Sequence, residues 1–355
     1  MTELDIPSSQ SLDIAEVWRA LAAAHRHLAE LKGLCEALPN SSILLDTLAI
    51  QEAKDSSEIE NIITTHDELY AHEQSSQTPS AAKEVQNYLA ALRVGTQEVA
   101  QSGLIRLATV LRMQEQVEQN NAGLRTLPGT VLKNQSTGAV VYEPPQDARQ
   151  VAKLMQDWVD FIHADDKLDP LLRMAVAHHQ FESIHPFYDG NGRTGRILNL
   201  LMLQREGLLD LPVLYMSRYI TSTKASYYRL LQSTRVTGNW APWCVYMLKA
   251  VALTAKSEVQ QIKKMRALMQ DTTLRLREAL PKVYSQELLN NLFRYPYTKI
   301  EFVEKDLGVS RITAAKHLDA LTAAGFVEKK KIGRSNFYIN QPLFALLTQI
   351  ALDDE

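Results

Sequence analysis

The chain has 355 residues, of which 45% are hydrophobic and 22% are charged, and its formal net charge is −3. This composition can bury a sizeable core in about two domains, and it excludes a protein that binds nucleic acid through an overall basic charge. Cys35 and Cys244 lie far apart, without metal-ligand spacing, which predicts buried thiols in a reducing compartment. The polar N-terminus, and the lack of an apolar run of about 18 residues, predict a cytoplasmic protein without a membrane span.

Helical periodicity dominates the chain up to about residue 280, and a single predicted β-hairpin interrupts it. Before the hairpin we expect helices over residues 12–31, 42–70, 81–102 and 104–120. Two short strands, 131–133 and 139–142, flank a polar turn with a glycine, and Pro144-Pro145 ends the hairpin. Helices resume over residues 147–163, 169–184, 193–206, 225–234 and 240–280. The pattern therefore predicts a mainly α fold with a small β-hairpin inserted in it.

The last part of the chain has a different pattern. Helices are expected over residues 285–294, 298–307 and 311–323, followed by strands 326–328 and 336–339 around a basic tip at 330–334. This order resembles a winged helix, and Ser310 is the expected N-cap of its third helix. The cations suited to phosphate contacts are Arg311, Lys316, Lys329, Lys330, Lys331 and Arg334. Binding to DNA and contact with a protein or dimer partner both stay open, because a fold alone does not fix a function.

We therefore expect three parts along the chain: an N-terminal helical region over 1–105, a helical core over 106–280, and the winged-helix-like module over 281–355.

The twelve residues from His185 to Arg196, HPFYDGNGRTGR, carry most of the chemical information. An apolar helix follows them, so Arg193 and Arg196 are expected in its first turn, where cations oppose the helix dipole. The loop Gly190–Gly192 can adopt positive φ and present bare N–H groups. Free amides, a positive helix end and two guanidiniums predict a receptor for a polyanion such as a di- or triphosphate. The alternative is a glycine loop that caps a helix with solvated arginines, but such a cap would not need these charges.

Two side chains near this loop suit the chemistry of a bound phosphate. Asp189 immediately precedes the loop, where a carboxylate could hold Mg²⁺ on the phosphates. His185 is the residue of the motif suited to accept a proton near neutral pH. Phe187 is expected to anchor the loop in the core. The pair His178-His179, on the preceding helix, is expected to pack or to lie at the surface rather than to bind a metal.

The motif resembles the signature of the Fic family, HPFx(D/E)GNGRxxR, and matches it at every position. The similarity extends over roughly residues 44–259, and the hairpin 131–142 resembles the family's target-registering flap. The resemblance implies a Fic catalytic core and protein adenylylation, in which AMP moves from ATP to a Ser, Thr or Tyr hydroxyl of a target or of the chain itself. The family variant that transfers phosphate has lysine at the second motif glycine, so Gly192 argues against that reaction.

The resemblance also implies roles for individual residues. His185 is the expected base, Asp189 the expected ligand of Mg²⁺, and ATP the expected substrate. The phosphates are assigned to Gly190, Asn191, Gly192, Arg193, Thr194, Gly195 and Arg196. Candidate nucleobase contacts are Ser222, Tyr227 and Tyr228, although tyrosines at this spacing are equally typical of a core. The hydroxyl-bearing target is expected at the flap.

Residues 56–61, SSEIEN, fit the family's inhibitory pattern (S/T)xxxE(G/N), here in an N-terminal helix. On a helix Ser56 and Glu60 share one face, with Asn61 next to them. Glu60 could then pair with Arg196 and occupy the guanidinium that the γ-phosphate needs. The alternative is an ordinary solvated helix surface. The same glutamate could orient a water molecule, so removal of AMP from a modified protein also stays open.

A different class of function competes with the enzyme: a DNA-binding regulator whose Fic body only senses a nucleotide. The presence of both His185 and Asp189 favours the enzyme, because a sensor would not need a base and a metal ligand. A homodimer stays open.

Overall fold

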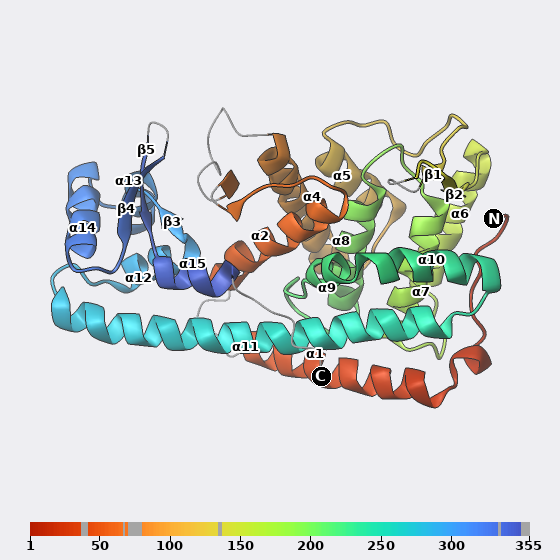
Figure 1. Cartoon of the computed structure of the whole chain (residues 1–355), viewed down its shortest axis with the longest axis horizontal. Helices are drawn as coiled ribbons and strands as arrows, with labels where there is room; N and C mark the ends of the chain where they lie inside the picture. The colour runs from red at the N-terminus through yellow and green to blue at the C-terminus, as the bar shows by residue number, and fades with distance from the viewer. Residues whose placement is uncertain (37–41, 67, 70–79, 134–136, 333–334, 349–355) are drawn as a thin grey trace.

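The computed structural model describes residues 1–36, 42–66, 68–69, 80–133, 137–332 and 335–348 (Figure 1). These residues form mainly helices, with one two-stranded and one three-stranded antiparallel sheet. The predicted mainly α fold with a small hairpin is therefore confirmed. None of the helices in the described part combines the length and the apolar character that a bilayer span requires. Cys35 and Cys244 are buried free thiols, as expected.

The N-terminal elements are a 3-10 helix (Ser9–Leu12), α1 (Ala15–Glu36), α2 (Ser42–Ile59), α4 (Ser80–Ser102) and α5 (Leu107–Glu118). The helix α2 is shorter than the predicted range 42–70. It ends because Asn61 has a φ of 62°, in the left-handed region that asparagine tolerates better than most residues. This early end places Glu60 in the turn that follows α2.

The middle of the chain contributes the flap and the central helices. The flap pairs β1 (Leu132–Lys133) with β2 (Val140–Tyr142), with Leu132 opposite Tyr142. The helices α6 (Ala148–Ile162), α7 (Pro170–Ile184) and α8 (Asn191–Arg205) follow. Nearly every residue of α7 and most of α8 are buried, because neighbouring helices cover them on all sides. These two helices form the centre of the core and hold the motif between them.

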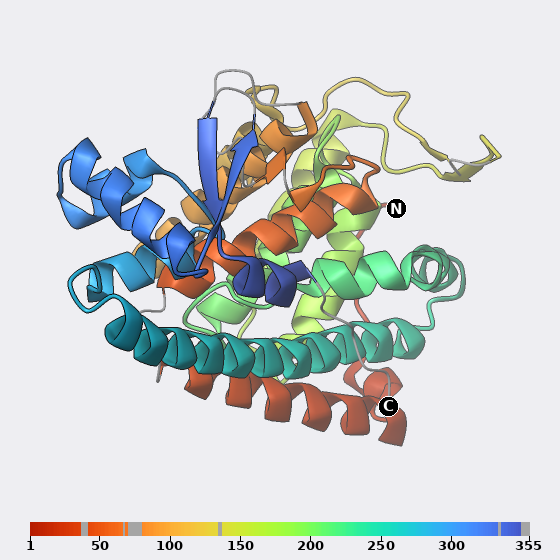
Figure 2. The same ribbon diagram turned by 60° about the vertical axis from the view of Figure 1, so that its left-hand side comes forward.

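Three more helices close this body: α9 (Met216–Ser222), which the sequence pattern does not predict, α10 (Lys224–Thr237) and α11 (Ala241–Ala279). The helix α11 is a single helix of 39 residues. Figure 2 shows α1 packed along it, and α11 continues beyond the body to reach the C-terminal module.

The C-terminal module consists of α12 (Gln286–Arg294), β3 (Tyr297–Thr298), α13 (Ile300–Leu307), α14 (Arg311–Ala323), β4 (Glu328–Ile332), β5 (Ser335–Ile339) and α15 (Gln341–Thr348). The strands form one sheet in the order β3-β5-β4. Ser310 caps α14 as predicted, because its side chain accepts a hydrogen bond from the Thr313 N–H. The sequence pattern predicts neither β3 nor α15. The module contacts the rest of the chain through α12 on α2 and α15 on α11.

The basic hairpin differs from its prediction. Lys330 and Lys331 lie within β4 rather than at the tip, because β4 extends to Ile332, and residues 333–334 lie outside the described part. Two of the cations expected to contact phosphate form ion pairs within the module. Arg311 lies 3.0 Å from a carboxylate oxygen of Glu301, and Lys329 lies 3.0 Å from Asp319. The division into 1–105, 106–280 and 281–355 stays a prediction.

Candidate active site

The motif begins with a sharp change of backbone direction at His185, immediately after α7. His185 has a φ of 50° and a ψ of 60°, and its N–H donates to the Phe181 carbonyl at 2.9 Å. The Phe187 side chain is fully buried, which confirms its predicted anchoring role. The Asn191 side chain closes the loop, since it accepts from the Phe187 N–H and donates to the Phe187 carbonyl, both at 2.9 Å. The Asn191 side chain therefore has a structural role in closing the loop, and its contact with phosphate stays a prediction.

The glycine loop has the predicted positive φ at Gly190, which is 77°. The helix α8 begins at Asn191, two residues earlier than predicted, because Gly190 in this conformation serves as its N-cap. Arg193 therefore lies in the first turn, whereas Arg196 lies in the second. The prediction that both arginines lie in the first turn is wrong for Arg196.

Two further residues of the predicted phosphate set have structural positions. The Thr194 N–H donates to the Gly190 carbonyl at 2.9 Å, so this amide is not free for an anion, and the residue is fully buried. Gly195 faces α7: a β-carbon added there would lie 2.9 Å from Glu182 Oε1 and 3.1 Å from the Phe181 ring. In this structure both residues have packing or backbone contacts within α8, and the assignment of Thr194 and Gly195 to the phosphates stays a prediction.

Arg193 is buried between two carboxylates. Its Nη1 lies 2.5 Å from Glu84 of α4, and its Nη2 lies 2.5 Å from Glu118 at the end of α5. Its Nε–H is buried without a hydrogen-bond partner among the described residues. Glu118 also lies against the loop, since a β-carbon at Gly190 would be 2.6 Å from Glu118 Oε1. The sequence reasoning missed both acids, which belong to helices far from the motif in the sequence.

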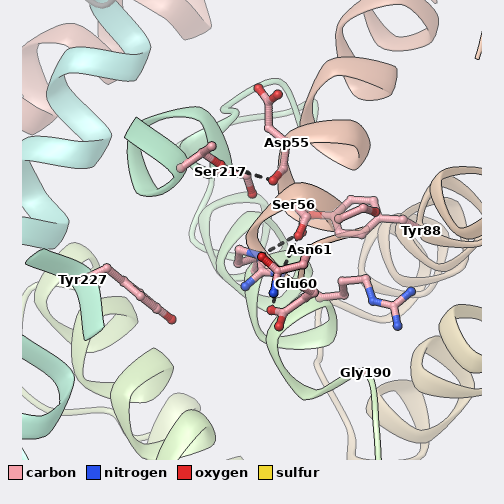
Figure 3. A network of polar contacts seen from close by, with 12 residues as sticks. Asp55, Ser56, Glu60, Asn61, Tyr88, Gly190, Ser217 and Tyr227 are labelled. Atoms are coloured by element: carbon pink, nitrogen blue, oxygen red, sulfur yellow. Dashed lines mark hydrogen bonds and ion pairs between the residues drawn. The ribbon is translucent and has the colours of Figure 1, made fainter. Parts of the chain in front are cut away.

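Arg196 forms the predicted ion pair with Glu60. Its Nη2 donates to Glu60 Oε1 at 2.9 Å and to the Ser56 carbonyl at 2.8 Å, and its Nε donates to Ser56 Oγ at 2.8 Å. Figure 3 shows Ser56, Glu60 and Asn61 gathered where α2 ends, close to Tyr88. The Arg196 side chain is almost completely buried, whereas Glu60 is one-third exposed. The alternative of a fully solvated Glu60 is therefore wrong.

The contacts of Arg196 also cap α2. The Ser56 carbonyl belongs to the last turn of α2, where carbonyl groups have no partner within the helix. A guanidinium placed there satisfies one such carbonyl and offsets the negative end of the helix dipole. Asn61 supplies the left-handed residue that ends the helix, and its side-chain oxygen accepts from Lys224 at 3.2 Å. This geometry gives a physical reason for a glycine or asparagine immediately after the glutamate.

One turn before Ser56, Glu52 anchors the helix α2 to its neighbours, and the sequence reasoning also missed this residue. Glu52 accepts hydrogen bonds from the Tyr88 hydroxyl at 3.0 Å, from Ser217 Oγ at 2.5 Å and from the Ser217 N–H at 3.1 Å. Burial raises the pKa of Glu52 to about 7, and the Ser217 and Tyr88 hydrogen bonds act in the opposite direction. Asp55, next along α2, lies 3.3 Å from Arg218 of α9. These contacts fix the helix that presents Glu60 (Figure 3).

His185 lies in a cationic environment. Its pKa is lowered to about 4, mainly by burial and also by the guanidiniums of Arg125 and Arg235, while Glu60 and Asp189 act in the opposite direction. A histidine with such a pKa is neutral at pH 7 and can accept a proton. Its Nδ1 is buried without a hydrogen-bond partner in the described part of the chain.

The predicted nucleobase residues separate into core and surface. Tyr227 is buried, its hydroxyl lies 2.8 Å from His178 Nε2, and its ring packs on Trp243. Tyr227 is thus a core residue, which favours the alternative of a core tyrosine, and its assignment as a nucleobase contact stays a prediction. Ser222 is exposed and donates to the Tyr219 carbonyl at 2.9 Å, and the Tyr228 ring is 45% exposed. His178 and His179 are both buried, which confirms that they pack.

Asp189 is suited to hold a divalent cation on a bound phosphate. Its side chain is exposed beside the glycine loop, and its Oδ1 accepts from the Gly190 N–H at 2.7 Å. Oδ2 remains for an ion. Mg²⁺ prefers one or two carboxylates together with phosphate oxygens and water, so a single carboxylate at this position fits. The described residues contain no group of three or more His, Cys, Asp and Glu side chains that could hold a metal by itself.

Comparisons with protein-family models match three parts of the chain. The Fic/DOC family N-terminal model matches residues 18–97, and the Fic/DOC family model matches residues 58–203. A model described as the C-terminal domain of SoFic-like protein adenylyltransferases matches residues 268–343. The last match covers most of the C-terminal module.

Curated relatives match shorter stretches. The chain is 35% identical over 109 residues to the protein adenylyltransferase fic-1 of Caenorhabditis elegans, which is 30% of this chain and 20% of that protein. It is 34% identical over 87 residues to a probable protein adenylyltransferase of Aquifex aeolicus, which is 24% of this chain and 27% of that protein. The match thus spans only about a fifth to a quarter of the length of these two relatives.

Solved structures share the fold. A Fic family protein from Desulfovibrio desulfuricans superposes with a TM-score of 0.60 at 20% identity, over 92% of this chain and 96% of that one. Fic-1 from C. elegans superposes with a TM-score of 0.51 at 23% identity, over 68% and 70% of the two chains.

Proposed function

The chain belongs to the Fic/DOC family, and we propose from this that it is a protein adenylyltransferase, which transfers AMP from ATP to a hydroxyl of a target protein. The observation that carries the proposal is the assembly of a proton acceptor, an exposed carboxylate and two arginines around the start of α8. The N-terminus of α8 can bind the phosphates of a nucleotide, because a helix N-terminus offers N–H groups and the positive end of the helix dipole.

The proposed reaction uses few groups. The target hydroxyl oxygen bonds to the α-phosphorus, the bond from that phosphorus to the bridging oxygen breaks, and pyrophosphate leaves. His185 takes the proton of the hydroxyl, for which its lowered pKa leaves it neutral at pH 7. Arg193 and the backbone N–H groups at the start of α8 would hold the phosphates. Mg²⁺ on Asp189 would neutralise phosphate charge when bound.

We further propose that Glu60 inhibits this reaction. The Glu60 carboxylate accepts a charge-assisted hydrogen bond from Arg196, and Ser56 takes two more donor contacts of the same guanidinium. A γ-phosphate that needs Arg196 must displace these partners. Glu60 is also one-third exposed, so it could orient a water molecule for removal of AMP. This hydrolysis of the bond between AMP and the target should disappear when Glu60 is replaced.

The flap is the proposed docking site of the target. Val140 and Val141 of β2 are exposed, and the strand pairs only with β1 among the described residues. An extended target segment could add to such a strand through main-chain hydrogen bonds.

The C-terminal module has the helix and strand order of a winged helix, and we propose that it makes protein contacts. Its Arg311 and Lys329 form ion pairs within the module, which weakens the case for phosphate contacts. Fluorescence anisotropy with a labelled DNA duplex at two salt concentrations tests this. Salt-sensitive binding would restore the DNA-binding alternative.

The proposed activity is tested by incubation with Mg²⁺ and either α- or γ-labelled ATP. Label should enter protein from α-labelled ATP but not from γ-labelled ATP. The incorporation should be stronger in the Glu60→Gly variant and absent in the Glu60→Gly/His185→Ala variant. Incorporation from γ-labelled ATP would instead mean phosphate transfer. No incorporation from either nucleotide into the chain or a cell lysate would contradict the proposal.

A further inference from the structure

We propose that Arg125 is a positioning residue for His185, because it binds the backbone on both sides of that histidine. The inference rests on the proposed function, in which His185 takes the proton of the target hydroxyl. Arg125 lies in the segment between α5 and the flap, where no periodic pattern draws attention to it. Its side chain is only 1% exposed.

Arg125 contacts three consecutive carbonyl groups. Its Nε donates to the His185 carbonyl at 2.8 Å, and its Nη2 donates to the Ile184 carbonyl at 3.2 Å. Its backbone N–H donates to the Pro186 carbonyl at 2.9 Å. The forked guanidinium and the backbone of one residue therefore determine the path of the chain through His185.

This path needs such support. The φ of 50° puts His185 in the left-handed region, which residues with a β-carbon rarely adopt. A backbone of this kind persists only where its surroundings fix it. The bond from the His185 N–H to the Phe181 carbonyl ties the turn to α7, and Arg125 binds the carbonyl groups of residues 184–186.

Arg125 also connects the flap to the base. Its Nη2 donates a further hydrogen bond to the Pro145 carbonyl, so Arg125 just before the flap is joined to Pro145 just after it. Gln146 braces the same region, accepting from the Gly129 N–H at 2.6 Å and donating to the Thr130 carbonyl at 2.9 Å. A target docked on the flap would thus be held in a fixed relation to His185.

The charge of Arg125 has a second effect on the base. Within the described residues no carboxylate pairs with Arg125, so its positive charge is not neutralised nearby. The charged groups that influence His185 are Arg125 and Arg235, which lower its pKa, and Glu60 and Asp189, which raise it. Burial is the largest cause, so loss of Arg125 should raise the pKa of His185 part of the way from about 4 toward 6.5.

The experiment separates geometry from charge with two variants, each made in the Glu60→Gly chain. Arg125→Gln removes the charge and the fork, whereas Arg125→Lys keeps the charge but cannot form the same set of hydrogen bonds. We expect kcat for AMP transfer to fall at least tenfold in both variants, with the KM for ATP changed less than twofold. The pKa of His185, measured by NMR with His185→Ala for assignment, should rise in Arg125→Gln and stay low in Arg125→Lys.

Arg149→Gln is the matched control, because Arg149 is exposed at the start of α6 and near the end of the flap. It should leave kcat and the pKa of His185 unchanged. The proposal would be overturned by Arg125 variants with normal kcat, or by equal changes in kcat, the KM for ATP and thermal stability. If the Glu60→Gly chain transfers no AMP, the proposed function fails, yet the NMR measurement still decides the role of Arg125. In that case the positioning role of Arg125 would be overturned if Arg125→Gln changed neither the pKa of His185 nor the hydrogen exchange of the Phe187 amide.

Discussion

The Glu60 carboxylate lies directly against the α-carbon of Gly192. A β-carbon added at Gly192 would be 2.1 Å from Glu60 Oε1 and 2.8 Å from Arg196 Nη1. The second motif glycine therefore leaves the space in which the carboxylate meets the guanidinium. Any side chain at this position would have to displace the ion pair, so the motif and residues 56–61 act as one unit although they lie far apart in the sequence.

Replacing Glu60 by glycine should increase AMP transfer. The substitution removes one partner of Arg196 and leaves the guanidinium available to phosphate. We expect transfer to rise about ten- to a hundredfold, which corresponds to the ~1.5–3 kcal/mol of a hydrogen bond to a charged group. The rate of incorporation from α-labelled ATP measures the change. Glu58→Gln is the control, because Glu58 pairs with Lys54 and not with Arg196. An unchanged rate at saturating ATP would remove the inhibitory role.

Replacing Arg196 by alanine in the Glu60→Gly chain should reverse that gain. In the Glu60→Gly chain, the higher rate of AMP transfer is expected to depend on the contact between the Arg196 guanidinium and the phosphate. The KM for ATP should rise, and the transfer rate should return toward that of the unaltered chain. A double variant as active as Glu60→Gly alone would show that Glu60 acts through another residue. Because Arg196 also caps α2, thermal unfolding of both variants should be followed in parallel.

Replacing Glu118 by glutamine should lower the KM for ATP. Arg193 is held between Glu84 and Glu118, so this corner carries more negative than positive charge. Removing one carboxylate charge should favour a polyphosphate by a factor of roughly five, equivalent to ~1 kcal/mol. Glu115→Gln, an exposed site on the same helix, is the control. A higher KM would instead mean that Glu118 positions Arg193 for the phosphate.

The transfer activity of the Glu60→Gly chain should persist to low pH. The pKa of His185 is lowered from 6.5 to about 4, so the base stays neutral until the pH approaches 4. The same shift has a consequence for stability. A depressed histidine pKa stabilises the fold above pH 6.5, and this contribution is lost as the pH falls toward 4. Rates measured from pH 4 to 8 should be paired with unfolding at each pH. A half-maximal rate near pH 6.5 in folded protein would argue against a depressed pKa.

Proline at Val140 should weaken target modification more than ATP binding. Val140 lies in β2 opposite Lys133, and proline removes a backbone donor from an exposed strand. The KM for a target protein should rise, while the KM for ATP should stay within twofold. Val140→Thr keeps the backbone N–H and serves as the control. Equal changes in both constants would argue against docking at the flap.

The sequence predicts the features that depend on local spacing. The positive φ of Gly190 and the burial of Phe187 are confirmed, because each follows from a short pattern with a known backbone or packing requirement. The pair between Glu60 and Arg196 is also confirmed, but it joins distant segments and its prediction rests on the resemblance to the Fic family. The roles assigned to them stay predictions.

Apart from that pair, the sequence does not predict contacts between segments that are distant along the chain. Glu84, Glu118 and Arg125 reach the motif from α4, α5 and the segment after α5. None of these segments has a composition that distinguishes a buried charge from a solvated one. Tyr227 shows the same limit: its spacing is compatible with a nucleobase contact and with the core, and packing against α7 and α11 buries it.

Because Arg196 caps α2, the affinity for a nucleotide is coupled to the ordering of the last turn of this helix. A phosphate that takes the guanidinium leaves the Ser56 carbonyl without its partner, so bound ATP should loosen the last turn of α2. If a second molecule binds and stiffens this turn, thermodynamic reciprocity requires that it lowers the affinity for ATP. The factor is the same as the one by which bound ATP lowers the affinity for that molecule. The helix α12 of the C-terminal module contacts α2, so a partner bound there could change the proposed activity without approaching the nucleotide.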